Sequence, residues 1–114
     1  LMSERIAKIN DFIRDNVSEI LNKEISFKKG LFVSIIKVST TKDLEETKIL
    51  VSVFPEKERR YAMVTLKKEI YRIQGALNRK MQIRRLPRIE FLLDTTQENV
   101  DKLESVFKQI EKEK

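Results

Sequence analysis

The sequence of 114 residues contains no cysteine and no histidine, and only two glycines and two prolines. Without cysteine and histidine the chain has no disulfides, no zinc site built on these residues, no cysteine nucleophile and no Ser-His-Asp triad. A cysteine-free chain is typical of a reducing compartment. No apolar run approaches the roughly 20 residues of a membrane span, and the N-terminus lacks the apolar core of a signal peptide. These absences predict a soluble, cytoplasmic protein.

Charged residues are abundant in the sequence. Charged residues make up 37% of the chain and hydrophobic residues 40%, with a formal net charge of +6 and a pI near 9.6. The length suits one domain with a thin core and a heavily solvated surface. The basic excess favours an anionic partner. Many stable domains are this basic without binding anything, so composition alone does not decide the function.

The periodicity of apolar and β-branched residues predicts three helices and three strands. In chain order they cover residues 3–24, 31–40, 46–54, 57–78, 81–93 and 96–112. The first two strands are joined by residues 41–45 as an antiparallel hairpin. Ser3 is expected as an N-cap and Asn78 as a left-handed C-cap. Pro87 predicts an edge position or a bulge in the third strand.

The predicted order α-β-β-α-β-α indicates an α+β fold: a single domain, residues 1–114, with helices packed on one face of a three-stranded mixed sheet. One face of the second strand carries Thr47, Ile49, Val51 and Val53. Val51 and Phe91 are predicted to be buried.

The C-terminal segment, residues 95–114, is predicted as the last helix. Its apolar face carries Val100, Leu103, Phe107 and Ile110. Residues 94–114 hold six acids against four lysines, so this segment differs in charge from the rest of the chain.

Basic residues line up on the second predicted helix and continue into the next strand. Lys68, Arg72, Gly75 and Arg79 follow one another at spacings of four, three and four, which aligns them in one row nearly opposite the apolar stripe. The stretch GALNRKMQIRRLP, residues 75–87, extends this row. The predicted anion-binding residues are Lys68, Arg72, Gly75, Arg79, Lys80, Arg84, Arg85 and Arg88.

Two interpretations of this row stand side by side. Helices usually carry charge away from the core, so the row can be an ordinary solvated face. The single sign of the charge favours phosphate binding instead. Gly75 costs about 1 kcal/mol relative to alanine in a helix interior. It therefore indicates a close approach of a nucleic-acid backbone, a helix kink, a packing site or a tolerated defect.

Three blocks of the sequence resemble the ribosome-binding factor A family, and the likeness covers residues 3–111. VSIIKVSTTKDLEETKILVSVF, residues 33–54, resembles that family's strand-turn-strand signature. MQIRRLPRIEF, residues 81–91, is similar to its Leu-Arg-Leu-Arg-Arg-Val-Pro-Glu-Leu-x-Phe pattern. SERIAKINDFIRDNVSEILNKEI, residues 3–25, looks like its opening helix.

The resemblance implies a KH-like domain of the prokaryotic type II arrangement, in which an Ala-x-Gly helix kink replaces the GxxG loop. It also implies a monomeric, non-catalytic assembly factor without metal, cofactor or small-molecule substrate. Such a factor binds 16S rRNA and the free 30S subunit during late small-subunit maturation. Counting back from Pro87, the kink positions hold Glu69, Ile70 and Tyr71, and the nearest glycine is Gly75. The kink is therefore either absent or shifted to Gly75.

Other function classes fit less of the sequence. A general single-stranded nucleic-acid-binding module, for RNA or DNA, would use the same basic surface. A protein-interaction module would use the first helix or the acidic last helix, but those apolar faces are needed for the core. An enzyme is not expected, because the sequence shows no metal cluster, no paired carboxylates in an apolar context and no Gly-rich phosphate loop.

Overall fold

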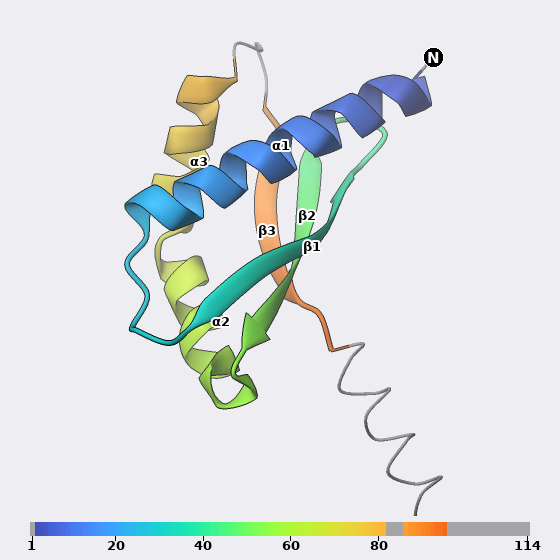
Figure 1. The fold of residues 1–114 in the computed structure, drawn as a ribbon. Helices are drawn as coiled ribbons and strands as arrows, with labels where there is room; N and C mark the ends of the chain where they lie inside the picture. The colour runs from blue at the N-terminus through green and yellow to red at the C-terminus, as the bar shows by residue number, and fades with distance from the viewer. Residues whose placement is uncertain (1, 82–85, 96–114) are drawn as a thin grey trace, which may run out of the picture.

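The computed structural model describes residues 2–81 and 86–95 of the chain (Figure 1). Its elements are α1 (Met2–Glu24), β1 (Phe32–Thr40), β2 (Glu46–Phe54), the 3-10 helix η1 (Glu56–Glu58), α2 (Arg59–Lys68), α3 (Ile70–Lys80) and β3 (Arg88–Leu93). The α+β class is confirmed, as is the α-β-β-α-β order with the second helical region divided in two. The predicted helix over residues 95–114 lies almost entirely outside the described residues, as do residues 82–85 of the predicted third strand.

The three strands form one mixed sheet in the order β1-β2-β3. β1 and β2 pair antiparallel, with a bulge between Ile35 and Lys37. β2 and β3 pair parallel. β3 is therefore an edge strand, and Pro87 directly precedes it, a position where the missing N–H costs no ladder hydrogen bond.

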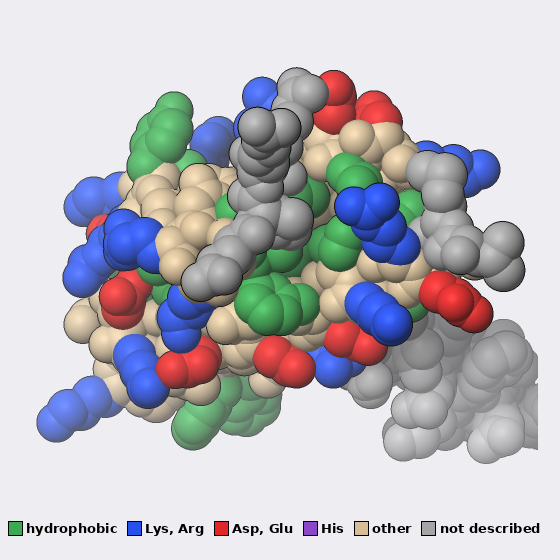
Figure 2. Space-filling model, turned by 90° about the horizontal axis from the view of Figure 1, so that it is seen from above, with side chains coloured by type: hydrophobic (Ala, Val, Ile, Leu, Met, Phe, Trp, Pro, Cys, Tyr) green, Lys and Arg blue, Asp and Glu red, His purple; other side chains and the backbone are tan. Residues whose placement is uncertain are grey.

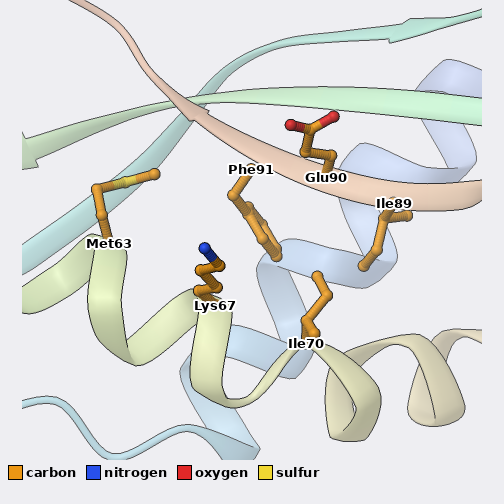
Figure 3. Close-up of a pocket in the computed structure, with 6 residues that line it drawn as sticks. All are labelled: Met63, Lys67, Ile70, Ile89, Glu90 and Phe91. Atoms are coloured by element: carbon orange, nitrogen blue, oxygen red, sulfur yellow. The ribbon is translucent and has the colours of Figure 1, made fainter.

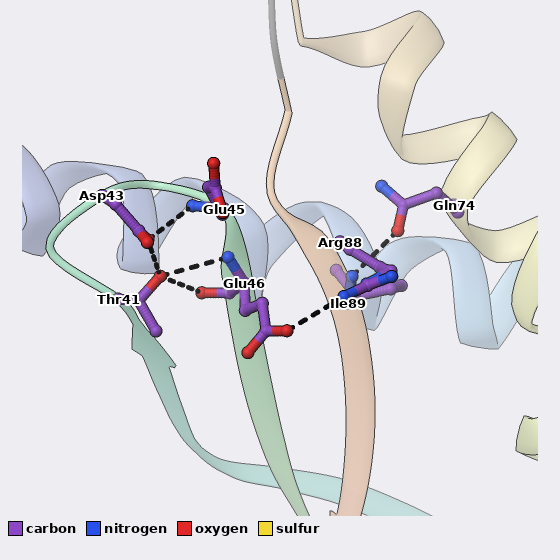
Figure 4. Close-up of polar contacts among 7 residues, drawn as sticks. All are labelled: Thr41, Asp43, Glu45, Glu46, Gln74, Arg88 and Ile89. Atoms are coloured by element: carbon purple, nitrogen blue, oxygen red, sulfur yellow. Dashed lines mark hydrogen bonds and ion pairs between the residues drawn. The ribbon is translucent and has the colours of Figure 1, made fainter.

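A polar turn closes the β1–β2 hairpin (Figure 4). The Asp43 carboxylate accepts hydrogen bonds from the Thr41 hydroxyl at 2.5 Å and from the Glu45 N–H at 3.1 Å. Leu44 takes up a left-handed conformation with φ of 61°. These local bonds satisfy the turn backbone and hold β1 and β2 in register.

The core lies on one face of the sheet. Along β2, Ile49 and Val51 are fully buried, whereas Lys48, which directly precedes Ile49, is exposed. The buried side chains pack against Ile13 of α1 and Ile73 of α3, so both helices cover the same face (Figure 1).

The buried face of β2 is confirmed for all four expected residues, which are Thr47, Ile49, Val51 and Val53. Phe91 is only half-buried, so its predicted full burial is wrong. It lies on the edge strand, where one side of the ring has no neighbouring strand.

The second helix is not continuous, contrary to the expectation for residues 57–78. It divides at Glu69, whose φ and ψ of −93° and 9° are not helical. Neither glycine nor proline lies at this break. Both halves contact β3, but α2 also packs on β2 whereas α3 also packs on α1. Tertiary packing therefore sets the bend.

Three predicted ends are also wrong. α1 begins at Met2, which places Ser3 inside the helix. α3 continues through Asn78 to Lys80, and the C-cap is Met81 in an extended conformation. β3 begins at Arg88, because Pro87 precedes the paired residues. None of the helices in the described part of the chain has the length and apolar character needed to cross a bilayer.

Candidate nucleic-acid interface

Two adjoining hollows lie between the α2–α3 break and the free edge of β3; together they are called the β3 groove here. One hollow has a volume of about 300 Å³ and is lined by Met63, Lys67, Ile70, Ile89, Glu90 and Phe91. The other has a volume of about 400 Å³ and is lined by Ile70, Tyr71, Gln74, Asn78, Leu86, Arg88 and Ile89. They share Ile70 and Ile89, so the groove follows the start of β3.

The first hollow combines an apolar floor with one cation (Figure 3). The side chains of Ile70, Ile89 and Phe91 extend toward one another from α3 and β3. The Lys67 ammonium projects from α2 toward this space. An apolar floor next to an ammonium group suits a planar base joined to a phosphate.

Gln74 fastens α3 to the free edge of β3 (Figure 4). Its side-chain carbonyl accepts a hydrogen bond from the Ile89 N–H at 2.9 Å. Its amide group donates to the Pro87 carbonyl at 3.2 Å and to Asn78 Oδ1 at 3.1 Å. The glutamine thus replaces a neighbouring strand at this point and fixes the wall of the groove.

We expect Gln74→Ala to lower the free energy of unfolding by about 1–2 kcal/mol, because the Ile89 N–H loses its partner in a partly buried place. Urea titration followed by circular dichroism measures this change. Asn78→Ala is the matched control, since it removes only the bond between the two side chains. It should change stability by less than about 0.5 kcal/mol. Equal losses in the two variants would contradict the edge-fastening role of Gln74.

Arg72, Gly75 and Arg79 lie together on α3, as their spacing indicates. A β-carbon placed on Gly75 would lie 3.6 Å from Arg79 Nη1, so the Arg79 side chain passes back over the glycine. α3 is continuous through Gly75, and the kink considered there is wrong. The break lies instead at Glu69, the first of the three kink positions counted back from Pro87. Lys68 is exposed at the end of α2, before the break.

Two other predicted site residues form ion pairs with distant acids. Lys80 Nζ lies 3.3 Å from Glu19 Oε2 on α1. Arg88 Nη2 lies 2.9 Å from Glu46 Oε1 on β2. The pKa of the Glu19 carboxyl is lowered, mainly by its hydrogen bond with Lys23 and next by its hydrogen bond with Lys80. Arg84 and Arg85 lie outside the described residues.

The distribution of charge agrees with this description. Figure 2 shows lysine and arginine side chains spread over this face of the molecule, with acidic side chains interspersed. Arg72 and Arg79 have no acidic partner among the residues that the structure describes. These two arginines, like the exposed Lys68, can meet phosphate without breaking an ion pair to a described residue.

Sequence reasoning missed Tyr71 and Gln74 as candidate functional residues. Tyr71 is 88% exposed and borders the second hollow of the β3 groove. An exposed aromatic ring among cations can stack on a nucleic-acid base. The sequence signal for Tyr71 was an aromatic residue within a row of polar residues along the helix. Gln74 lies in the same row, but its role depends on a strand that follows many residues later.

Comparison with known proteins is consistent across sequence and structure. The profile of the family described as Ribosome-binding factor A matches residues 5–107. A protein from Chlorobium phaeobacteroides (strain BS1), named Ribosome-binding factor A, is 31% identical over 111 residues, which cover 95% of this chain and 95% of that protein.

Two known structures share the fold. The crystal structure of ribosome-binding factor A from Thermus thermophilus has a TM-score of 0.66 at 24% identity, covering 77% of this chain and 93% of that chain. The second is a homology model of Thermus thermophilus ribosome-binding factor A fitted into the cryo-EM map of its complex with the 30S subunit. It has a TM-score of 0.59 at 26% identity and covers 78% of this chain and 90% of that chain.

Proposed function

This chain belongs to the ribosome-binding factor A family, and we propose that it binds the free 30S ribosomal subunit through 16S rRNA during late small-subunit maturation. The observation that carries the proposal is the match to this family over residues 5–107. The related homology model fitted into the cryo-EM map of a 30S complex supports it. The protein acts as a non-catalytic cytoplasmic monomer.

The β3 groove and the exposed face of α3 form the proposed rRNA contact. The groove offers apolar side chains and the Lys67 ammonium to an unstacked nucleotide. Tyr71 provides an exposed ring for stacking. The proposed phosphate-binding residues are Lys68, Arg72, Gly75, Arg79, Lys80, Arg84, Arg85 and Arg88, with Gly75 admitting the backbone of the RNA. This combination suits single-stranded or loop RNA, whose bases are free to leave a stack.

The ion pairs of Lys80 and Arg88 divide the proposed contacts into two groups. Lys68, Arg72 and Arg79 have no acidic partner among the described residues and can meet phosphate directly. Lys80 and Arg88 must exchange a carboxylate for a phosphate. The Arg88–Glu46 pair is exposed, with 79% of the Arg88 side chain accessible. Exposed pairs contribute roughly 0–1 kcal/mol, so this exchange costs little.

We expect the protein to sediment with free 30S subunits and to be nearly absent from 70S ribosomes and polysomes. An assembly factor must leave before translation, whereas a general nucleic-acid-binding protein would follow total RNA. Sucrose-gradient fractions of a cell lysate, probed with an antibody to the chain, measure the distribution. Naked single-stranded DNA, added to the lysate as a competitor, is the control for general nucleic-acid binding. Equal occupancy of 30S subunits and polysomes would contradict the assembly role.

A further inference from the structure

The sheet has a second face that no described helix covers. α1, α2 and α3 lie on the side of the buried β2 residues (Figure 1). The side chains between those buried residues point the other way. Among them, Phe32 of β1 and Phe54 of β2 are 65% and 67% exposed. Two phenylalanines this exposed are unusual on a domain this small.

These aromatic residues and three further apolar side chains of the same face are together called the open-face patch here; the small Ser34–Ser52 pair lies between the phenylalanines and Leu50. Phe32 lies directly opposite Phe54 in the β1–β2 ladder. Leu50 lies opposite Leu92 in the β2–β3 ladder. The bulge in β1 adds Ile36, which is 52% exposed. A sheet face in contact with water normally carries polar residues at such positions.

The chain leaves the sheet at the border of this patch. β3 ends at Leu93, which pairs with Val51. The Asp94 N–H then donates to the Val51 carbonyl at 2.7 Å. Val51 lies three residues before Phe54 on β2, a distance of about 10 Å along a strand. Whatever follows Asp94 therefore starts beside Leu92 and within reach of both phenylalanines.

The sequence that follows matches the patch in polarity and length. Its apolar residues recur at helical spacing, and they are Val100, Leu103, Phe107 and Ile110. A helix over residues 97–112 would extend about 24 Å. The three strands span only about 10 Å across, so such a helix is long enough to cover them.

The charges are also complementary. Residues 94–114 hold six acids against four lysines. Lys37 is an exposed cation opposite Leu50 on this face, and the exposed Lys29 and Lys57 lie three residues from Phe32 and Phe54 in the sequence. Acidic side chains on the flanks of a docked helix would meet these lysines.

We propose that residues 96–114 fold back as an amphipathic helix over the open-face patch and make a third layer on the sheet. The apolar residues of the segment cover Phe32, Phe54 and Leu92. The core face and the β3 groove stay as they are, and of the described residues in the proposed RNA contact, Arg88 shares the open face of β3 with Leu92.

Two charge-matched pairs of substitutions test this docking in the full chain. Leu103→Asp with Phe107→Asp places two acids on the apolar face of the segment. Ser105→Asp with Gln109→Asp places two acids at the same spacing on its opposite face. In ¹H–¹⁵N NMR spectra, the first pair should shift the amide resonances of Phe32, Phe54 and Leu92. It should also raise the fluorescence of the dye ANS several-fold, because the patch becomes accessible. The second pair should do neither.

A substitution from the sheet side tests the same contact in reverse. Phe54→Ser should shift the amide resonances of residues 100–110, while unchanged signals from Ile13 and Ile73 show that the core remains folded. The proposal is overturned if the first pair leaves the sheet resonances at their wild-type positions, or if both pairs shift them equally. It is also overturned if the patch resonances depend on protein concentration and sedimentation equilibrium gives a dimer, since a second copy then covers the patch.

Discussion

Replacement of Val51 by aspartate is expected to unfold most of the protein at 37 °C. Val51 is fully buried in the central strand and pairs with Ile35 on one side and Leu93 on the other. Removal of its apolar side chain costs about 1.5–3 kcal/mol. Burial of an unpaired polar group adds roughly 1–3 kcal/mol. A domain of this size is stable by about 5–15 kcal/mol in total, so a combined loss of roughly 2.5–6 kcal/mol removes a large part of its stability, and all of it at the lower end of that range.

Thermal unfolding followed by circular dichroism measures this effect, and we expect a fall in Tm of roughly 20–30 °C or no transition at all. Ser39→Asp is the control, because it adds the same residue to an exposed position of β1 opposite Lys48. That variant should melt within a few degrees of the wild type. A normal transition for Val51→Asp would mean that the central strand and its buried face are misplaced.

The strands that local sequence specifies were predicted closely. β1 and β2 are runs of β-branched residues, and Gly30 and Pro55 flank them within two residues. Their pairing needs only the short turn between them. β3 was predicted too long, because the periodic pattern continues across Pro87, which directly precedes the ladder.

The break at Glu69 could not be read from local sequence. Residues 57–78 carry one continuous helical pattern, and the residue that departs from helical geometry is an ordinary helix former. The bend arises because α2 packs on β2 and α3 on α1, while both keep contact with β3. Counting back from Pro87 by the family resemblance gave the correct position, but the absence of glycine there suggested Gly75 instead.

The candidate site could likewise be predicted from the sequence only in part. The helical period was sufficient to place Arg72, Gly75 and Arg79 together. The partners of Lys80 and Arg88 are acids on other elements, far away in sequence. The same holds for Gln74, whose bond to Ile89 requires the position of an edge strand. One-dimensional spacing predicts which residues share a face, whereas only the packed fold shows which charges are already paired.

The second large effect is expected on RNA affinity when Arg72 and Arg79 are replaced. Both are exposed on α3 and have no acidic partner among the described residues. Their combined replacement by alanine should lower the affinity for a single-stranded RNA oligonucleotide roughly a hundredfold, if each loses a charged hydrogen bond worth about 1.5 kcal/mol. The slope of log K against log salt should fall by roughly 1.4, at about 0.7 per phosphate. Fluorescence anisotropy over a salt series measures both quantities.

Two comparisons separate a localised site from general electrostatic attraction. Lys8→Ala with Lys42→Ala removes the same charge from exposed positions on α1 and on the hairpin turn. This pair should leave affinity within about twofold, because salt screens charges that lie more than about 10 Å from the RNA. Tyr71→Ala should weaken binding without changing the salt slope, since stacking releases no counterions. If the Lys8 and Lys42 pair weakens binding as much as the arginine pair does, net charge alone explains the affinity and the site on α3 is wrong.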